Sequence, residues 1–150
     1  MDGDLKAIEM AISRASVWFQ IHADQRLKLF NFYVLIFLGS LAGFGTVVKE
    51  KLYSLELGIP LLLLLLTYSF KELDKRSAAL VKHAETALDV LESKLEAATG
   101  LVEVKLIQAA KKKDGVISYR QAFNIVFITA VLACIAGVTL AVFHIENTKP

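Results

Sequence analysis

The chain has 150 residues, of which 55% are hydrophobic and 21% are charged, and its formal net charge is +2. A mean hydropathy of +0.53 excludes an ordinary soluble domain and is typical of membrane proteins. Three windows contain no Asp, Glu, Lys or Arg: 29–48, 57–70 and 121–145. We therefore expect an all-α integral membrane protein with three transmembrane helices, an N-terminal amphipathic helix and a cytoplasmic helical hairpin or coiled coil.

Residues 1–28 are expected to form the N-terminal amphipathic helix. Apolar or aromatic side chains recur there at helical spacing, at Leu5, Ile8, Ile12, Ala15, Phe19 and His22. The charged residues of this segment make it too polar to span a bilayer and unlike a cleavable signal peptide. The helix can therefore lie in the headgroup plane or pack against other cytoplasmic helices, and the sequence leaves both readings open.

Residues 29–70 are expected to form a transmembrane hairpin. A bilayer core of ~30 Å needs about 20 residues, and the second span reaches that length by extending back to Leu52, past Glu56. Gly39 and Gly43 form a GxxxG pair, which fits either internal packing against the second span or contact between subunits. We expect Pro60 to occupy the first turn of its helix, where proline is tolerated.

Residues 71–120 are expected to form a cytoplasmic helical region. Its first part carries a coiled-coil seam at Leu73, Leu80, Ala84, Ala87, Leu91, Leu95 and Ala98. A second face holds an acidic stripe, interpreted as solvated, at Glu85, Asp89, Glu92 and Glu96. Gly100 is expected to break the helix, and a second helix over 101–113 would return the chain to the membrane. The third transmembrane helix then covers 121–145, and 146–150 form a tail.

The basic residues predict the orientation of these spans. All of the 17 Lys and Arg residues except Lys49, Lys51 and Lys149 fall in the N-terminal segment or in 71–120. The positive-inside rule therefore places the N-terminus and the 71–120 region in the cytoplasm.

No catalytic or metal-binding motif is present. His22, His83 and His144 fall in three separate segments, and Cys134 is the single cysteine. HExxH, CxxC, phosphate-binding glycine loops and nucleophile elbows are all missing. We expect no enzymatic activity, no metal and no cofactor, and we interpret Cys134 as a small packing residue.

Two groups of polar residues are the candidate functional residues. Neutral polar side chains in the spans, which fit hydrogen bonds between helices or a pore lining, are Asn31, Thr67, Asn124 and Thr129. Basic residues near the cytoplasmic boundary are Lys105, Lys111, Lys112, Lys113 and Arg120. The basic group fits a juxtamembrane anchor to anionic lipid. Repeated around an oligomer, it also fits a ring that binds a polyanion.

The segment 17–37, VWFQIHADQRLKLFNFYVLIF, resembles small bacterial membrane effectors of anti-phage defence, especially the membrane effector of the Hailong system. The resemblance rests on an aromatic pair, then HA-x-QRL, then F-N-aromatic entering a span, at Trp18, Phe19, His22, Ala23, Gln25, Arg26, Leu27, Phe30, Asn31 and Phe32. A two-span hairpin followed by a long cytoplasmic helix is also similar to the broader SLATT class, from whose simplest two-span members the third span departs.

This resemblance implies a homo-oligomeric, tetrameric ion channel in the bacterial inner membrane, with its N-terminus in the cytoplasm. In the Hailong arrangement, a nucleotidyltransferase makes short single-stranded DNA oligomers (oligodeoxyadenylate) that hold the channel shut. Their loss during infection opens the pore and depolarises the membrane, in a form of abortive infection. Two alternatives remain: an effector activated by a nucleotide messenger, and a scaffold that recruits partners through its coiled coil.

Overall fold

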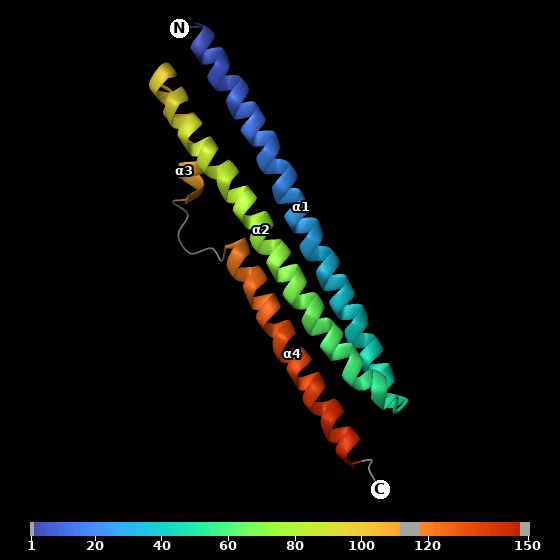
Figure 1. The fold of residues 1–150 in the computed structure, drawn as a ribbon. Helices are drawn as coiled ribbons and strands as arrows, with labels where there is room; N and C mark the ends of the chain where they lie inside the picture. Colours follow the sequence, from blue (N-terminus) through green and yellow to red (C-terminus); the bar gives the residue numbers. More distant parts are fainter. Residues whose placement is uncertain (1, 112–117, 148–150) are drawn as a thin grey trace. The chain divides into compact units, whose positions relative to one another are not determined.

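The structure is a computed structural model that describes residues 2–111 and 118–147. All the regular elements of this part of the chain are helices (Figure 1), in the order α1 (Asp2–Lys49), α2 (Tyr53–Thr99), the 3-10 helix η1 (Val102–Val104), α3 (Leu106–Lys111) and α4 (Tyr119–Asn147). Within it, α1, α2 and α4 are long and apolar enough to cross a membrane. The expected all-α membrane fold is confirmed.

The chain divides into two compact units. We call one the membrane unit, which comprises Lys28–Asp74 and Ser118–Pro150, and the other the polar unit, which comprises Met1–Leu27 and Lys75–Ile117. Both α1 and α2 therefore contribute one part to each unit, whereas α4 belongs to the membrane unit alone.

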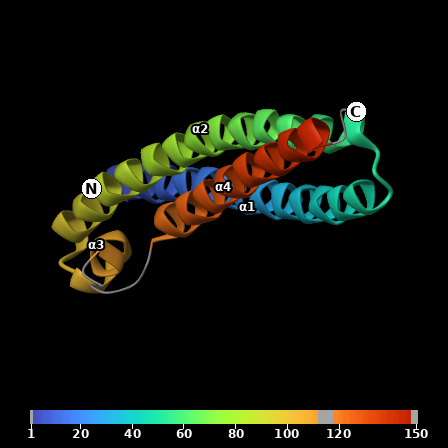
Figure 2. The same cartoon turned by 90° about the horizontal axis from the view of Figure 1, so that it is seen from below.

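Three helical segments run side by side in the membrane unit (Figures 1 and 2), from α1, α2 and α4. The buried face of α4 repeats at alternating steps of four and three residues, at Phe123, Phe127, Ala130, Cys134, Gly137 and Ala141. The same alternation is found on α2 at Glu56, Pro60, Leu63 and Thr67, all of which are buried. Such a repeat keeps one stripe of each helix against its neighbours over its whole length.

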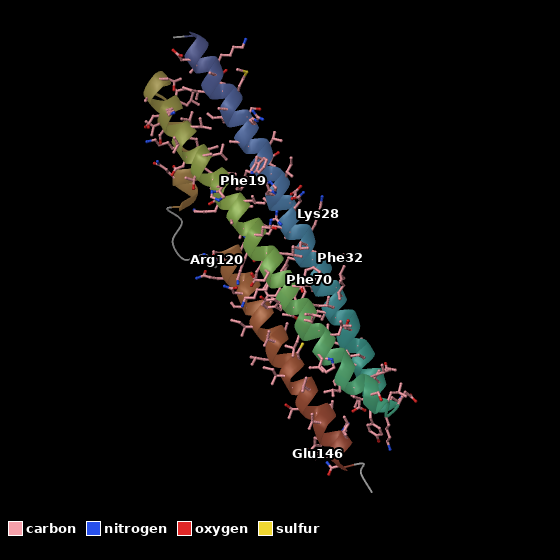
Figure 3. All side chains as sticks on the ribbon, in the orientation of Figure 1. Phe19, Lys28, Phe32, Phe70, Arg120 and Glu146 are labelled. Atoms are coloured by element: carbon pink, nitrogen blue, oxygen red, sulfur yellow. The ribbon has the colours of Figure 1, made fainter. Side chains whose placement is uncertain are left out.

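Aromatic side chains fill one end of this interior. The rings of Phe30 and Phe123 stack with centroids 3.7 Å apart, and the buried Tyr33 lies against Phe127 with centroids 4.9 Å apart. The side chain of Phe70, labelled in Figure 3, also packs against this cluster. These contacts bring together residues of α1, α2 and α4.

One expectation about the hairpin is wrong, and one of the two alternatives for its glycine pair is excluded. Because α2 already begins at Tyr53, Pro60 lies inside the helix and not in its first turn. The Gly39–Gly43 pair does not pack against the second span, since a Cβ built on either glycine has nothing within 4 Å in the subunit. Gly137 is the tightly packed glycine instead, because its Cβ would lie 3.2 Å from Cβ of Pro60.

The polar unit buries the apolar stripe of the N-terminal helix. Each of the six expected stripe residues, from Leu5 to His22, is half-buried, and the C-terminal half of α2 buries Ala84 and Leu88 in the same unit. The stripe thus packs against helical neighbours. Three of the seven expected seam residues, Leu73, Ala87 and Ala98, are exposed, and Leu88 is buried in place of Ala87. A straight α-helix drifts by about 20° per heptad from a strict seven-residue repeat.

The return segment is not the single continuous helix that the sequence predicts. Gly100 ends α2 with a φ of 74°, as expected of a helix-ending glycine, but the described residues 101–111 form two separate elements, η1 and α3. The acidic stripe holds this segment. Glu92, only 8% exposed, accepts a hydrogen bond from the Ile107 N–H at 3.0 Å, and Glu96 pairs with Lys105.

Candidate functional site

The structure describes the predicted basic group only in part. Lys105 is half-buried, in the ion pair with Glu96, so a phosphate would have to compete with a carboxylate for this ammonium group. Arg120 is exposed near the start of α4 (Figure 3). Lys111 is the last residue of α3, and Lys112 and Lys113 lie outside the described residues.

Three of the four neutral polar candidates lie on the outer surface of the membrane unit. Asn31, Asn124 and Thr129 are exposed, so they face away from the packed interior of the subunit. The fourth, Thr67, makes a polar contact between helices inside the unit, as expected. Tyr33 Oη and Thr67 Oγ1 are 3.1 Å apart and buried.

A buried acid–base pair is the most unusual feature of the membrane unit. Glu56, in the first turn of α2, is 0% exposed, and its Oε2 lies 3.0 Å from Nδ1 of His144 in the last turn of α4. Ionisable residues in membrane-spanning segments are rare, usually paired with one another, and often functional. This pair therefore adds a second candidate site to the basic group.

The Glu56 carboxylate is only half satisfied. Its second oxygen, Oε1, is buried and has no hydrogen-bond partner. An unpaired buried acceptor costs free energy, about 1–3 kcal/mol and more when it is charged. The main-chain carbonyl of Glu56 has a related deficit, because residue 60, its partner in the helical repeat, is a proline without an N–H.

This pair was not expected from the sequence, although the repeat of buried positions points to it. Continuing the α4 stripe by three residues from Ala141 gives His144, and continuing the α2 stripe back by four from Pro60 gives Glu56. Two ionisable residues that fall on the inner stripes of two spans, at the same end of the unit, are candidates for pairing.

An apolar cavity of about 350 Å³ lies between the three helices, next to the close approach of Pro60 and Gly137. Its lining includes Phe37, Phe44 and Cys134. None of the side chains around it is charged, so it offers no partner to an ionic ligand. Among residues 2–111 and 118–147, no cluster of three His, Cys, Asp or Glu side chains could hold a metal ion.

Comparison with known proteins gives one informative similarity. The chain is 36% identical over 88 residues to CD-NTase-associated protein 19 of Escherichia coli, in an alignment that covers 53% of this chain and 57% of that protein. The chain thus spans little more than half the length of this relative. No family model matches the chain, and no solved structure matches it.

Proposed function

We propose that this chain is the membrane effector of a bacterial anti-phage defence system and works with a nucleotidyltransferase. It would act as a homo-oligomeric, tetrameric ion channel of the inner membrane, and no reaction is assigned to the chain itself. A short single-stranded DNA oligomer bound on the cytoplasmic side would hold the channel closed. Loss of the oligomer would open the pore and depolarise the membrane.

The observation that carries this proposal is a membrane fold in a chain similar to a CD-NTase-associated protein. Helices α1, α2 and α4 are long and apolar enough to cross a membrane, and the relative's name associates that protein with a CD-NTase. The segment 17–37 also resembles the Hailong effector. The distribution of Lys and Arg favours a cytoplasmic N-terminus.

The surface of the membrane unit supports assembly into an oligomer. A single subunit has too few helices to surround a wide aqueous path, so conduction requires several copies in a closed ring. The exposed Asn31, Asn124 and Thr129 are available to such a ring, either between subunits or along the pore. The DNA oligomer would bind the basic group, with Lys111, Lys112 and Lys113 as its centre.

Co-purification tests the ligand. Protein extracted in detergent at low salt should carry a short nuclease-sensitive DNA. If binding uses six to ten phosphate contacts, affinity should fall by about 10³ or more between roughly 50 and 200 mM salt, because each contact releases condensed counterions. Replacing Lys111, Lys112 and Lys113 with Glu should abolish retention.

A charge-matched control separates a site from a general effect of charge. Replacing Lys6, Lys82 and Lys94 with Glu changes the net charge equally, on exposed side chains elsewhere in the polar unit. This control should keep the DNA. Retention by the first triple variant, or equal loss from both, would contradict the assignment of the ligand site.

The nucleotide-messenger alternative predicts the opposite sign of gating. The name of the relative is consistent with this alternative, because a nucleotidyltransferase can make a messenger that opens an effector. In liposomes loaded with a potassium-sensitive dye, removing oligodeoxyadenylate should start the flux if the ligand closes the channel. Flux that starts only when a nucleotide is added would favour the messenger, and no flux under either condition would favour a scaffold.

A further inference from the structure

The region around Glu56 holds more hydrogen-bond acceptors than donors. The carboxylate Oε1 is buried without a partner, and the main-chain carbonyl lacks its helical donor because residue 60 is proline. Both acceptors belong to one residue that is 0% exposed. A buried group of acceptors is stabilised by a bound donor, and the smallest donor that can reach it is a proton.

His144 provides the route for that proton. Its side chain is 35% exposed, whereas that of Glu56 is fully buried, and the Nδ1–Oε2 distance of 3.0 Å is a hydrogen bond. The imidazole is therefore partly exposed, and its Nδ1 is hydrogen-bonded to the Glu56 carboxylate. Histidine changes its charge between about pH 5 and 8, and chains of His and acidic residues carry protons in membrane proteins.

We propose that Glu56 and His144 form a proton-binding site at the end of the membrane unit where the 49–52 turn lies. When His144 is protonated, the two side chains are a complete ion pair that fastens the start of α2 to the end of α4. When His144 is neutral, the hydrogen bond loses its charge assistance and a buried carboxylate is left without a counter-ion. Proton loss would therefore loosen this end of the unit.

The other ionisable groups at this end are positioned differently. Among the described residues they are Lys49, Glu50, Lys51, Tyr53 and Glu146, of which all but the half-buried Tyr53 are exposed. Figure 3 shows Glu146 near the end of α4. Charges in contact with water are screened, so the buried pair should dominate the response to protons.

The effect on gating rests on the proposed channel function and has a defined sign. In a planar bilayer, raising the pH from about 6 to about 8 in the chamber that faces the 49–52 turn should increase the conductance. We expect roughly fivefold or more, the usual lower size of coupling between two sites. The same change in the opposite chamber should have less effect, and exchanging K⁺ for Na⁺ at constant pH should not reproduce it.

Two substitutions should remove the pH dependence in opposite directions. Glu56→Gln removes the charge of the acid, so the conductance should be high at both pH values. His144→Lys supplies a permanent cation, so it should be low at both. Glu146→Gln is the control on the same helix and should behave as the unaltered protein does. An unchanged pH response in either pair variant would overturn the proposal.

A second measurement is independent of conduction. The chain has three histidines, so the NMR spectrum of ¹⁵N-histidine-labelled protein in detergent is simple to assign with a His144→Gln variant. Glu56→Gln should displace the titration of the His144 ring signals and leave those of His22 and His83 in place. If the His144 titration is the same with and without Glu56, the site is not coupled and the proposal fails. If it is displaced but no conductance is found under any condition, the proton site stands and the channel function fails.

Discussion

At the scale of single residues, two hydroxyl groups connect α1 and α2 within the membrane unit. Thr67 Oγ1 donates to the Leu63 carbonyl at 2.7 Å, so its only proton is already used. The 3.1 Å contact with Tyr33 must then have the Tyr33 hydroxyl as donor and Thr67 Oγ1 as acceptor. This arrangement leaves neither buried hydroxyl without a partner.

Tyr33→Phe tests the value of this contact. It should lower the free energy of unfolding by about 0.6 kcal/mol, the average for side-chain hydrogen bonds between membrane helices, because Thr67 keeps its bond to Leu63. Unfolding in mixed detergent micelles measures the change. Tyr68→Phe, at a side chain that is 64% exposed, is the control and should have no effect. An equal loss in the two variants would show that the hydroxyl contact contributes nothing.

At the scale of helices and their connections, the acidic face of α2 is a docking surface and not a solvated stripe. Glu92 holds the N–H of Ile107, and Glu96 pairs with Lys105. Glu85, two helical turns before Glu92, instead accepts a hydrogen bond from Lys82 on the same helix at 3.0 Å. Two carboxylates thus hold the return segment, although acidic residues on a helix surface would normally be expected to face water.

Glu92→Met should release the return segment while preserving the volume of the side chain. The Ile107 N–H would lose its acceptor, at a cost of about 1–3 kcal/mol, and a loss of ~1.4 kcal/mol makes the opening equilibrium constant tenfold larger, so exchange should be about tenfold faster. Hydrogen exchange of the amides of η1 and α3 measures this. Glu85→Met should leave the exchange unchanged, and equal protection in both variants would show that Glu92 does not hold the segment.

The open face of Gly39 and Gly43 on α1 makes a prediction about assembly. Since nothing in the subunit lies within 4 Å of a Cβ at either position, Gly39→Leu with Gly43→Leu should leave the subunit folded. If another copy packs there, the double variant should lose the oligomer, as measured by native mass spectrometry. Gly45→Leu, an equally open position on another side of α1, should retain it. An oligomer that survives the double substitution would move the interface elsewhere.

At the scale of the whole molecule, the spans were predictable because lipid-exposed helices require long stretches without charge. The windows 29–48 and 121–145 fall inside α1 and α4, and Gly100 ends α2. The Glu56–His144 pair was not found, because its members are 88 residues apart and each looks like a boundary residue by itself. Interhelical pairing depends on which stripes face each other, and that is decided by packing. The ring of basic residues stays a prediction.

The orientation of the protein can be tested by labelling. In a chain with the buried Cys134 replaced by Ala, cysteine is introduced by Ser13→Cys or Ser54→Cys, both at exposed positions in opposite parts of α1 and α2. Because the basic residues favour a cytoplasmic N-terminus, a charged, impermeant maleimide added to spheroplasts should label the Ser54→Cys protein alone. Labelling of the Ser13→Cys protein would show that the N-terminus lies outside the cytoplasm.

The distance along the chain between Glu56 and His144 also has a consequence for biogenesis. The ribosome releases Glu56 88 residues before His144, which at about 5–20 residues per second is an interval of roughly 4 to 18 s. During that time the first two spans contain Glu56, but its partner His144 has not yet been synthesised. Only the last helix brings His144, so a nascent chain stalled before α4 has Glu56 without its partner.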